Sequence, residues 1–135
     1  MIDGATGEVV LAEGTRLGRD LTLDAFVWTS PLHKAARRGE GAAGWTSWHL
    51  DLDLEKGGLF HLCLRFKDDA LQWIELSLPW KGAPFGAEPE WKAAHDRWIE
   101  ETLGAAPPVI RPWGRVESVA DSRGGGCQIL VKYRG

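Results

Sequence analysis

Apolar and polar residues alternate along residues 45–80, and this alternation predicts three consecutive antiparallel strands at the centre of the protein. In residues 48–54 every second residue is apolar and the residues between them are polar. The same period of two returns in residues 60–66 and again in residues 74–78. One face of the predicted sheet is therefore lined by leucine and phenylalanine, and the other face is polar.

The pairing of the first two strands follows from this parity. A slip of one residue would expose every apolar side chain, so paired residues must have the same parity. A three-residue loop at 56–58, which contains two glycines, satisfies this condition. It predicts that Asp53 lies opposite His61 and that Asp51 lies opposite Cys63.

The third strand extends the polar face. One register that keeps the apolar sides together sets Glu75 beside His61 and Trp73 beside Cys63. The polar face then carries a row of Asp53, His61 and Glu75, with an exposed tryptophan next to it. These residues are the predicted functional surface.

The chain before residue 45 predicts minor elements. Residues 8–11 fit a short edge strand, and residues 22–30 fit a short helix with Thr22 or Asp20 as its N-cap. Residues 32–44 are rich in glycine and alanine and predict a loop. This loop carries a small basic cluster of Lys34, Arg37 and Arg38, which is either a solvated surface or a contact for an anion or an acidic partner.

The chain after residue 80 predicts one long helix and a final hairpin. Residues 88–103 have an apolar stripe at helical spacing, and Gly104 is a typical C-terminal stop. Residues 113–119 and 127–133 read as two strands. The order predicts one α+β domain over residues 1–135. It has two layers: a mostly antiparallel sheet of about five or six strands, with the long helix on its leucine face and a short N-terminal helix.

Composition limits the classes of function. A net charge of −3 with no basic block argues against nucleic-acid binding. No apolar run approaches the ~20 residues of a membrane span, and no secretory signal precedes the first strand. Two cysteines, Cys63 and Cys127, fit a reducing compartment, so we expect a cytoplasmic protein. Zinc and phosphate-loop motifs are absent, so no metal or cofactor is expected.

Eight tryptophans are the unusual feature of the composition. Indole side chains need burial or a partner, and aromatic residues dominate the anchors of protein interfaces. We therefore expect this tryptophan-rich protein either to bury these rings or to use some of them for recognition.

The second half of the chain resembles a family of small uncharacterised bacterial α+β proteins. The resemblance rests on a helix with Trp91, His95-Asp96-x-Trp98-Ile99 and Leu103-Gly104, and on a hairpin with Trp113-Gly114-x-Val116-x-Ser118. The family is similar in size and make-up to immunity proteins of bacterial toxin systems. No activity, catalytic residue or cofactor is established for the family, so the resemblance assigns none, and it leaves the role of His95 open.

Three functions remain open at this stage. The first is a non-catalytic, immunity-like module that binds a basic, toxin-like protein through the acidic and aromatic sheet face. Its binding residues would be Asp51, Asp53, His61, Trp73 and Glu75. The second is a hydrolase or metal-dependent enzyme that uses His61 with Asp53 and Glu75, because a carboxylate beside an imidazole supports a general base. The third is a structural homodimer subunit.

Overall fold

A seven-stranded antiparallel sheet forms the body of the protein in the computed structural model, which describes residues 1–39, 41–56, 58–78, 88–121 and 126–134. The strand order is β3-β4-β5-β6-β9-β8-β7, and every neighbouring pair is antiparallel. The strands are β3 (Arg37–Gly39), β4 (Trp45–Leu54), β5 (Gly58–Lys67), β6 (Ala70–Ser77), β7 (Val109–Arg111), β8 (Gly114–Asp121) and β9 (Gly126–Tyr133).

The remaining elements lie on one side of this sheet. Strands β1 (Val9–Val10) and β2 (Arg16–Leu17) form a separate two-stranded sheet. Helix α1 (Leu23–Thr29) is followed by the 3-10 helix η1 (Pro31–Ala35), and helix α2 is Glu88–Leu103. The predicted bounds of α2 are thus confirmed. Thr22 is the N-cap of α1, because its hydroxyl accepts a hydrogen bond from Ala25 N.

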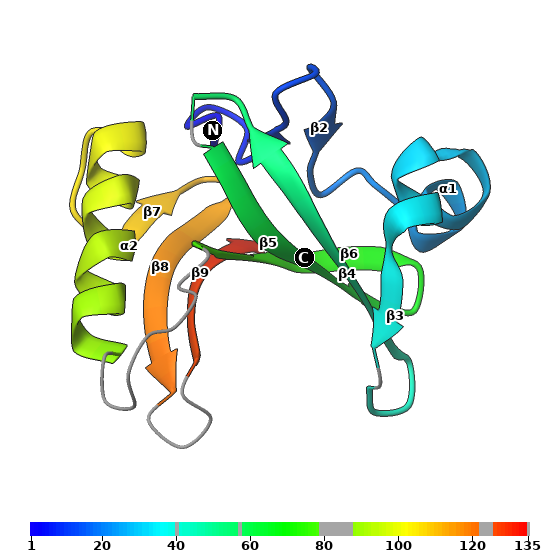
Figure 1. Cartoon of the computed structure of the whole chain (residues 1–135). Coiled ribbons are helices and arrows are strands. Elements are labelled where there is room, and N and C mark those ends of the chain that lie inside the picture. The colour runs from blue at the N-terminus through cyan, green and yellow to red at the C-terminus, as the bar shows by residue number, and fades with distance from the viewer. Residues whose placement is uncertain (40, 57, 79–87, 122–125, 135) are drawn as a thin grey trace.

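The protein has the two layers that the sequence predicts, with a different distribution of the cover (Figure 1). Helix α2 packs on β8 and β9 rather than on the meander β4–β6. It reaches the meander through Trp98, whose ring centroid lies 5.0 Å from that of Phe60. The N-terminal segment and α1 cover the meander instead, as the contact between the Phe26 and Phe66 rings shows.

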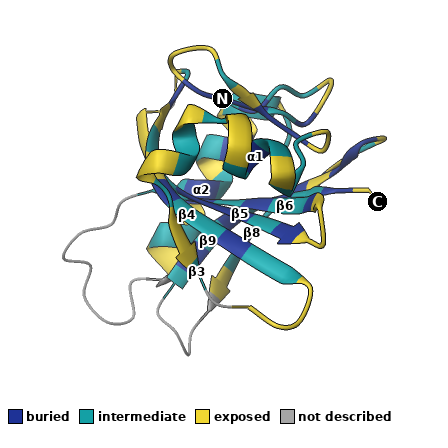
Figure 2. Ribbon diagram, turned by 90° about the vertical axis from the view of Figure 1, so that its right-hand side faces the viewer, coloured by how far each residue is buried: buried dark blue, intermediate teal, exposed yellow. Residues whose placement is uncertain are grey.

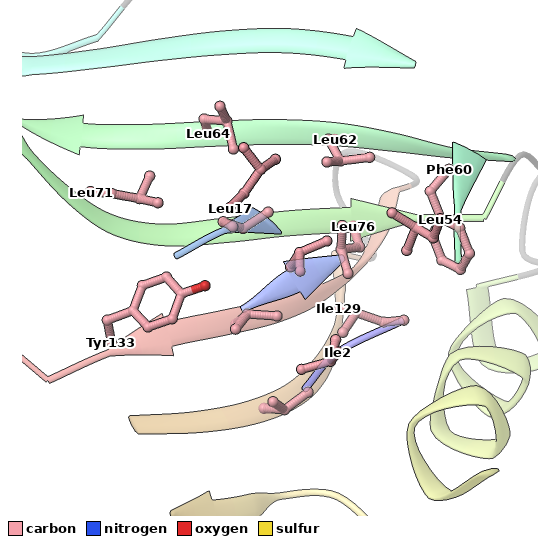
Figure 3. Close-up of a cluster of buried hydrophobic side chains, with 14 of the residues drawn as sticks. Ile2, Leu17, Leu54, Phe60, Leu62, Leu64, Leu71, Leu76, Ile129 and Tyr133 are labelled. Atoms are coloured by element: carbon pink, nitrogen blue, oxygen red, sulfur yellow. The ribbon is translucent and has the colours of Figure 1, made fainter. Parts of the chain in front are cut away.

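The core lies between the sheet and this cover (Figure 3). The even-numbered residues of β5 point into it and are fully buried, namely Phe60, Leu62, Leu64 and Phe66. Ile74 and Leu76 of β6 extend the same face. The predicted parity of the meander is therefore confirmed. Figure 2 shows the resulting pattern, with buried residues along the strands and exposed residues on α1 and the loop ends.

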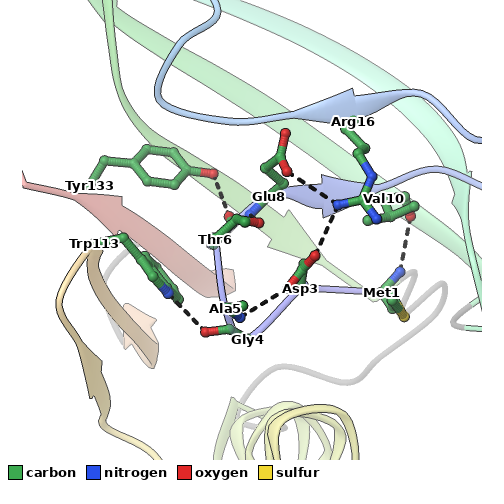
Figure 4. A network of polar contacts seen from close by, with 11 residues as sticks. Met1, Asp3, Gly4, Ala5, Thr6, Glu8, Val10, Arg16, Trp113 and Tyr133 are labelled. Carbon is green, nitrogen blue, oxygen red and sulfur yellow. Dashed lines mark hydrogen bonds and ion pairs between the residues drawn. The ribbon is translucent and has the colours of Figure 1, made fainter.

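The N-terminal segment is tied to the last strands by side chains of the final hairpin (Figure 4). The Tyr133 hydroxyl donates to the carbonyl oxygen of Gly7 at 2.8 Å, and the Trp113 indole donates to that of Gly4 at 2.9 Å. Both rings are buried. The first residues are therefore part of the core layer rather than a loosely attached end.

Two predictions about the strands are wrong. The sheet has seven strands rather than five or six, because β3 lies inside the predicted loop and β7 follows α2. Each has three residues, which is too short to show an alternating pattern. The predicted edge strand at residues 8–11 contains β1, which pairs with β2, and this segment pairs with the main sheet only by the isolated bridge between Leu11 and Leu54 among the described residues.

The hairpin register is also wrong, by two residues. Leu54 pairs with Gly58, so Asp51 lies opposite His61 and Asp53 lies opposite Leu59. A shift of two preserves which face each side chain occupies, so the hydrophobic pattern cannot detect it. Residues 79–87, between β6 and α2, and residues 122–125, between β8 and β9, lie outside the described residues.

None of the described helices has the length and apolar character needed to span a bilayer. Both cysteines are buried and unbridged.

Candidate functional site

The polar face of the sheet carries most of the predicted site residues, and the described helices lie on the opposite face (Figure 1). We call this polar side the open face. Its side chains come from alternate positions of the seven described strands of this sheet, so register decides which of them are neighbours.

One row of neighbours crosses the open face from β4 to β7 and is rich in cations. We call it the cationic row. Arg65 lies opposite Trp73, Trp73 opposite Lys132, and Lys132 opposite Arg115. Ser47 continues the row on β4 and Ile110 continues it on β7.

The next two rows are closer to the β4–β5 turn. The middle row contains His49, Cys63, Glu75, Leu130 and Glu117. The row beyond it contains Asp51, His61 and Ser77, and Asp53 lies one step further along β4. Arg37 of β3 lies opposite His49 and extends the middle row. Asp51 and Asp53 thus lie near the β4–β5 turn, whereas Arg65, Lys132 and Arg115 lie in the cationic row.

A chain of polar contacts links four side chains across β4 and β5. The His61 Nδ1 lies 2.8 Å from the Asp51 carboxylate, and the His61 Nε2 lies 3.4 Å from the His49 Nδ1. The His49 Nε2 in turn lies 3.7 Å from the Cys63 sulfur. A small pocket of about 90 Å³ opens beside these residues.

The electrostatics of this chain disfavour a cysteine nucleophile. Burial, with the nearby Glu75 carboxylate, raises the pKa of Cys63 to about 12, so the thiol stays protonated near neutral pH. Burial, followed by the neighbouring His61 and Arg65, lowers the pKa of His49. His49 is therefore neutral near pH 7 and acts as a hydrogen-bonding group.

The Glu75 carboxylate is already engaged. It forms an ion pair with Arg65, its diagonal neighbour on β5. Burial opposes the charge on Arg65, yet the hydrogen bond with Glu75 raises the pKa of the guanidinium. The pair is partly buried, so the two side chains hold each other in place on the open face.

The predicted row of Asp53, His61 and Glu75 is therefore not assembled. His61 contacts Asp51 and His49, Glu75 contacts Arg65, and Asp53 lies opposite Leu59. Trp73 lies beside Arg65 rather than beside Cys63. The geometry thus does not bring Asp53 and Glu75 to His61, as the hydrolase hypothesis predicts, and the carboxylate beside this imidazole is that of Asp51. Within the part of the chain that the structure describes, no three His, Cys, Asp or Glu side chains are arranged to hold a metal ion.

An aromatic pair beside the cationic row is not predicted from the sequence. The ring centroids of Trp45 and Trp73 lie 5.0 Å apart, so the two indoles meet across β5. Lys67 Nζ lies 5.8 Å from the Trp45 ring, and Lys132 Nζ lies 5.8 Å from the Trp73 ring. Parity places both tryptophans on the polar face, because both have odd numbers, but it does not predict that their rings meet.

A larger pocket lies at the β7 end of the cationic row. Its volume is about 350 Å³, and its lining includes Ile110, Arg115, Lys132 and Arg134. The Ile110 side chain is 63% exposed, which is unusual for a large apolar residue on a strand.

His95 is placed away from the open face. It is fully buried on α2, and its Nε2 accepts a hydrogen bond from Leu78 N at 3.1 Å. The ring therefore anchors the end of β6 against α2. Burial lowers the pKa of His95 to about 4, so the ring is neutral near pH 7.

A comparison with solved structures identifies a chain of similar fold. No family model matches the chain, and no curated protein matches it. The chain is similar to one chain of a solved structure described as Rhs1-CT in complex with cognate immunity protein RhsI1. The TM-score is 0.59 at 19% identity, over 98% of this chain and 86% of that one. At this identity the likeness shows a shared fold.

Proposed function

We propose that the protein is a binding module with an immunity-like role, which recognises and blocks a protein partner through the open face of its sheet. The shared fold with a chain from a complex of an immunity protein and its cognate partner supports this proposal, since both proteins in such a complex bind a protein. The single observation that carries it is the open face itself, with half-exposed tryptophans and charged side chains that the described helices leave uncovered.

The acidic end of this face is the contact for a basic part of the partner. The Asp51 side chain is 65% exposed, and Asp53 is exposed beside it on the same face. Opposite charge on a partner would guide the encounter and set the orientation of the complex. Trp73 supplies the aromatic area, while His61 and Glu75 hold their neighbours in position.

Co-expression tests this proposal. The protein is produced together with the product of each gene that flanks its own, and the complexes are measured by size-exclusion chromatography with light scattering. We expect one flanking product to inhibit growth when expressed alone and to form a complex with this protein. Trp73→Ala and Asp53→Lys should each weaken that complex by about tenfold or more.

A matched control lies on the other side of the molecule. Glu100 is exposed on α2, so Glu100→Lys changes the charge by the same amount as Asp53→Lys without touching the open face. It should leave the affinity unchanged. The proposal fails if no flanking product binds, if the protein forms a dimer of itself through this face, or if the control weakens binding as much as the open-face variants do.

A further inference from the structure

We infer that the cationic row, together with Trp45 and Lys67, is a second contact that binds an acidic, apolar-bearing segment of a protein. This inference rests on the proposed function, since it takes the open face to be the binding surface. The partner segment bound here is acidic, whereas the part of the partner that the Asp51–Asp53 end would bind is basic. The partner would therefore present a basic patch and an acidic segment side by side.

Charge is the first argument. The protein has a net charge of −3, yet this end of the open face is basic. Two carboxylates, Glu75 and Glu117, pair with the cations there. The nearby Asp69 carboxylate turns towards α1, where it accepts from Asp24 N. The cations outnumber these carboxylates and are Arg65, Lys67, Arg115, Lys132 and Arg134.

The state of the tryptophans is the second argument. Trp45 and Trp73 are half-buried against each other, and a lysine ammonium lies over each ring. A cation over an aromatic ring is attracted by the negative face of the ring, which holds it in place. The lysines are thus pre-positioned at the rings, so a partner carboxylate can meet the ammonium while its apolar side chain covers the indole.

Dimensions give the size of the segment. From Arg65 on β5 to Ile110 on β7 the row crosses four strand spacings, which is about 19 Å at ~4.8 Å per spacing. An extended segment of about six residues covers this length. Alternation of acidic and apolar side chains in the segment would match the row, and the pocket beside Ile110 would receive one apolar side chain.

A synthetic peptide tests the inference directly. The probe is a peptide of about six residues with alternating Glu and Leu, and the control probe has Lys in place of Glu. Binding to the whole protein is followed by NMR through the indole N–H signals of Trp45 and Trp73, assigned with Trp→Phe variants. We expect the acidic peptide to shift both signals, and the basic peptide to shift neither.

Charge reversal locates the contact. Lys67→Glu with Lys132→Glu should weaken binding of the acidic peptide by about tenfold or more, whereas Asp51→Lys should not weaken it. Thermal unfolding of each variant shows that it is folded. The inference is overturned if the acidic peptide does not bind, if the lysine variant binds it equally well, or if a single-stranded oligothymidylate binds this end more tightly than the peptide.

The outcome separates the two proposals. If the acidic peptide fails while a flanking-gene product still binds in a way that depends on Asp53, the second contact is wrong and the proposed function stands. If the peptide binds but no flanking product does, the cationic row is a real contact and the proposed function is the part that fails.

Discussion

Backbone conformation at single residues explains part of the sequence, and Gly114 at the start of β8 is the clearest case. Its φ is +153°, and an added Cβ would overlap the carbonyl oxygen of Lys132 on the neighbouring strand. Gly114→Ala should therefore lower the free energy of unfolding by about 2 kcal/mol or more, because it combines an unfavourable conformation with a backbone clash. Urea denaturation measures this change.

Gly104 is the matched control for this prediction. Its φ is +74°, which L residues also rarely adopt, but no atom of the other described residues beyond its own helix and chain neighbours lies within 4 Å of an added Cβ. Gly104→Ala should cost about 1 kcal/mol, which is the conformational part alone. Equal losses of unfolding free energy at the two glycines would show that the close approach of Gly114 to β9 does not affect stability.

Histidine titration gives a second prediction at this scale, because His95 is buried and neutral. Its pKa of about 4 in the folded protein lies below the usual value of 6.5, so the unfolded chain binds a proton first as the pH falls. The free energy of unfolding should decrease between about pH 6.5 and pH 4, by at most about 1.4 kcal/mol per pH unit. Above pH 6.5 this contribution should be constant.

A glutamine at position 95 isolates this effect. His95→Gln retains an acceptor for Leu78 N but cannot titrate. Urea denaturation at several pH values should show that the stability difference between the two proteins narrows as the pH falls towards 4. A difference that is constant with pH would mean that another group causes the acid sensitivity.

At the scale of the elements, the sequence predicts those strands and helices whose hydrophobic pattern repeats several times. The meander and α2 are long, so their periods of two and 3.6 are repeated often enough to identify them. Short elements carry no such repeat, and β3 was interpreted as loop for that reason. The polar character of the open face was predictable, because parity alone determines it.

The neighbours within that face were not predictable from parity. The turn after β4 could close with either of two registers that put the same side chains on the same face. The choice between them decides whether His61 contacts Asp51 or Asp53. The pairing of β6 with β9, which brings Lys132 over Trp73, joins segments far apart in the chain and leaves no local signal.

Helix α2 offers a prediction at this scale. Ile99 is fully buried under the helix, whereas Glu100 next to it is exposed. Ile99→Ala should lower the free energy of unfolding by about 2–4 kcal/mol, because it leaves a cavity between α2 and the sheet. Glu100→Ala should change stability by less than about 0.5 kcal/mol. Chemical denaturation followed by circular dichroism compares the two variants, and similar values would contradict the packing of α2.

For the molecule as a whole, the two faces of the sheet have different roles. The apolar face holds the helices and the N-terminal segment, and it supplies the core. The open face contributes little core and carries charged and aromatic side chains, which leaves it available for recognition. Substitutions on the open face should therefore affect binding more than stability. Substitutions of side chains that hold the two ends of the chain together should affect stability more than binding.

The hydrogen bond between Tyr133 and Gly7 tests this difference between the two faces, because it joins residues near opposite ends of the chain. Burial, with the nearby Glu8 carboxylate, raises the pKa of Tyr133, so its hydroxyl remains a donor to the buried Gly7 carbonyl. Tyr133→Phe should lower the free energy of unfolding by about 1–2 kcal/mol, since it leaves that carbonyl without its donor. The adjacent Lys132→Gln, on the open face, should change stability by less than about 0.5 kcal/mol. Hydrogen exchange should show faster exchange of the β1 amides in Tyr133→Phe and not in Lys132→Gln; equal protection in both variants would mean that the N-terminal segment is held without this bond.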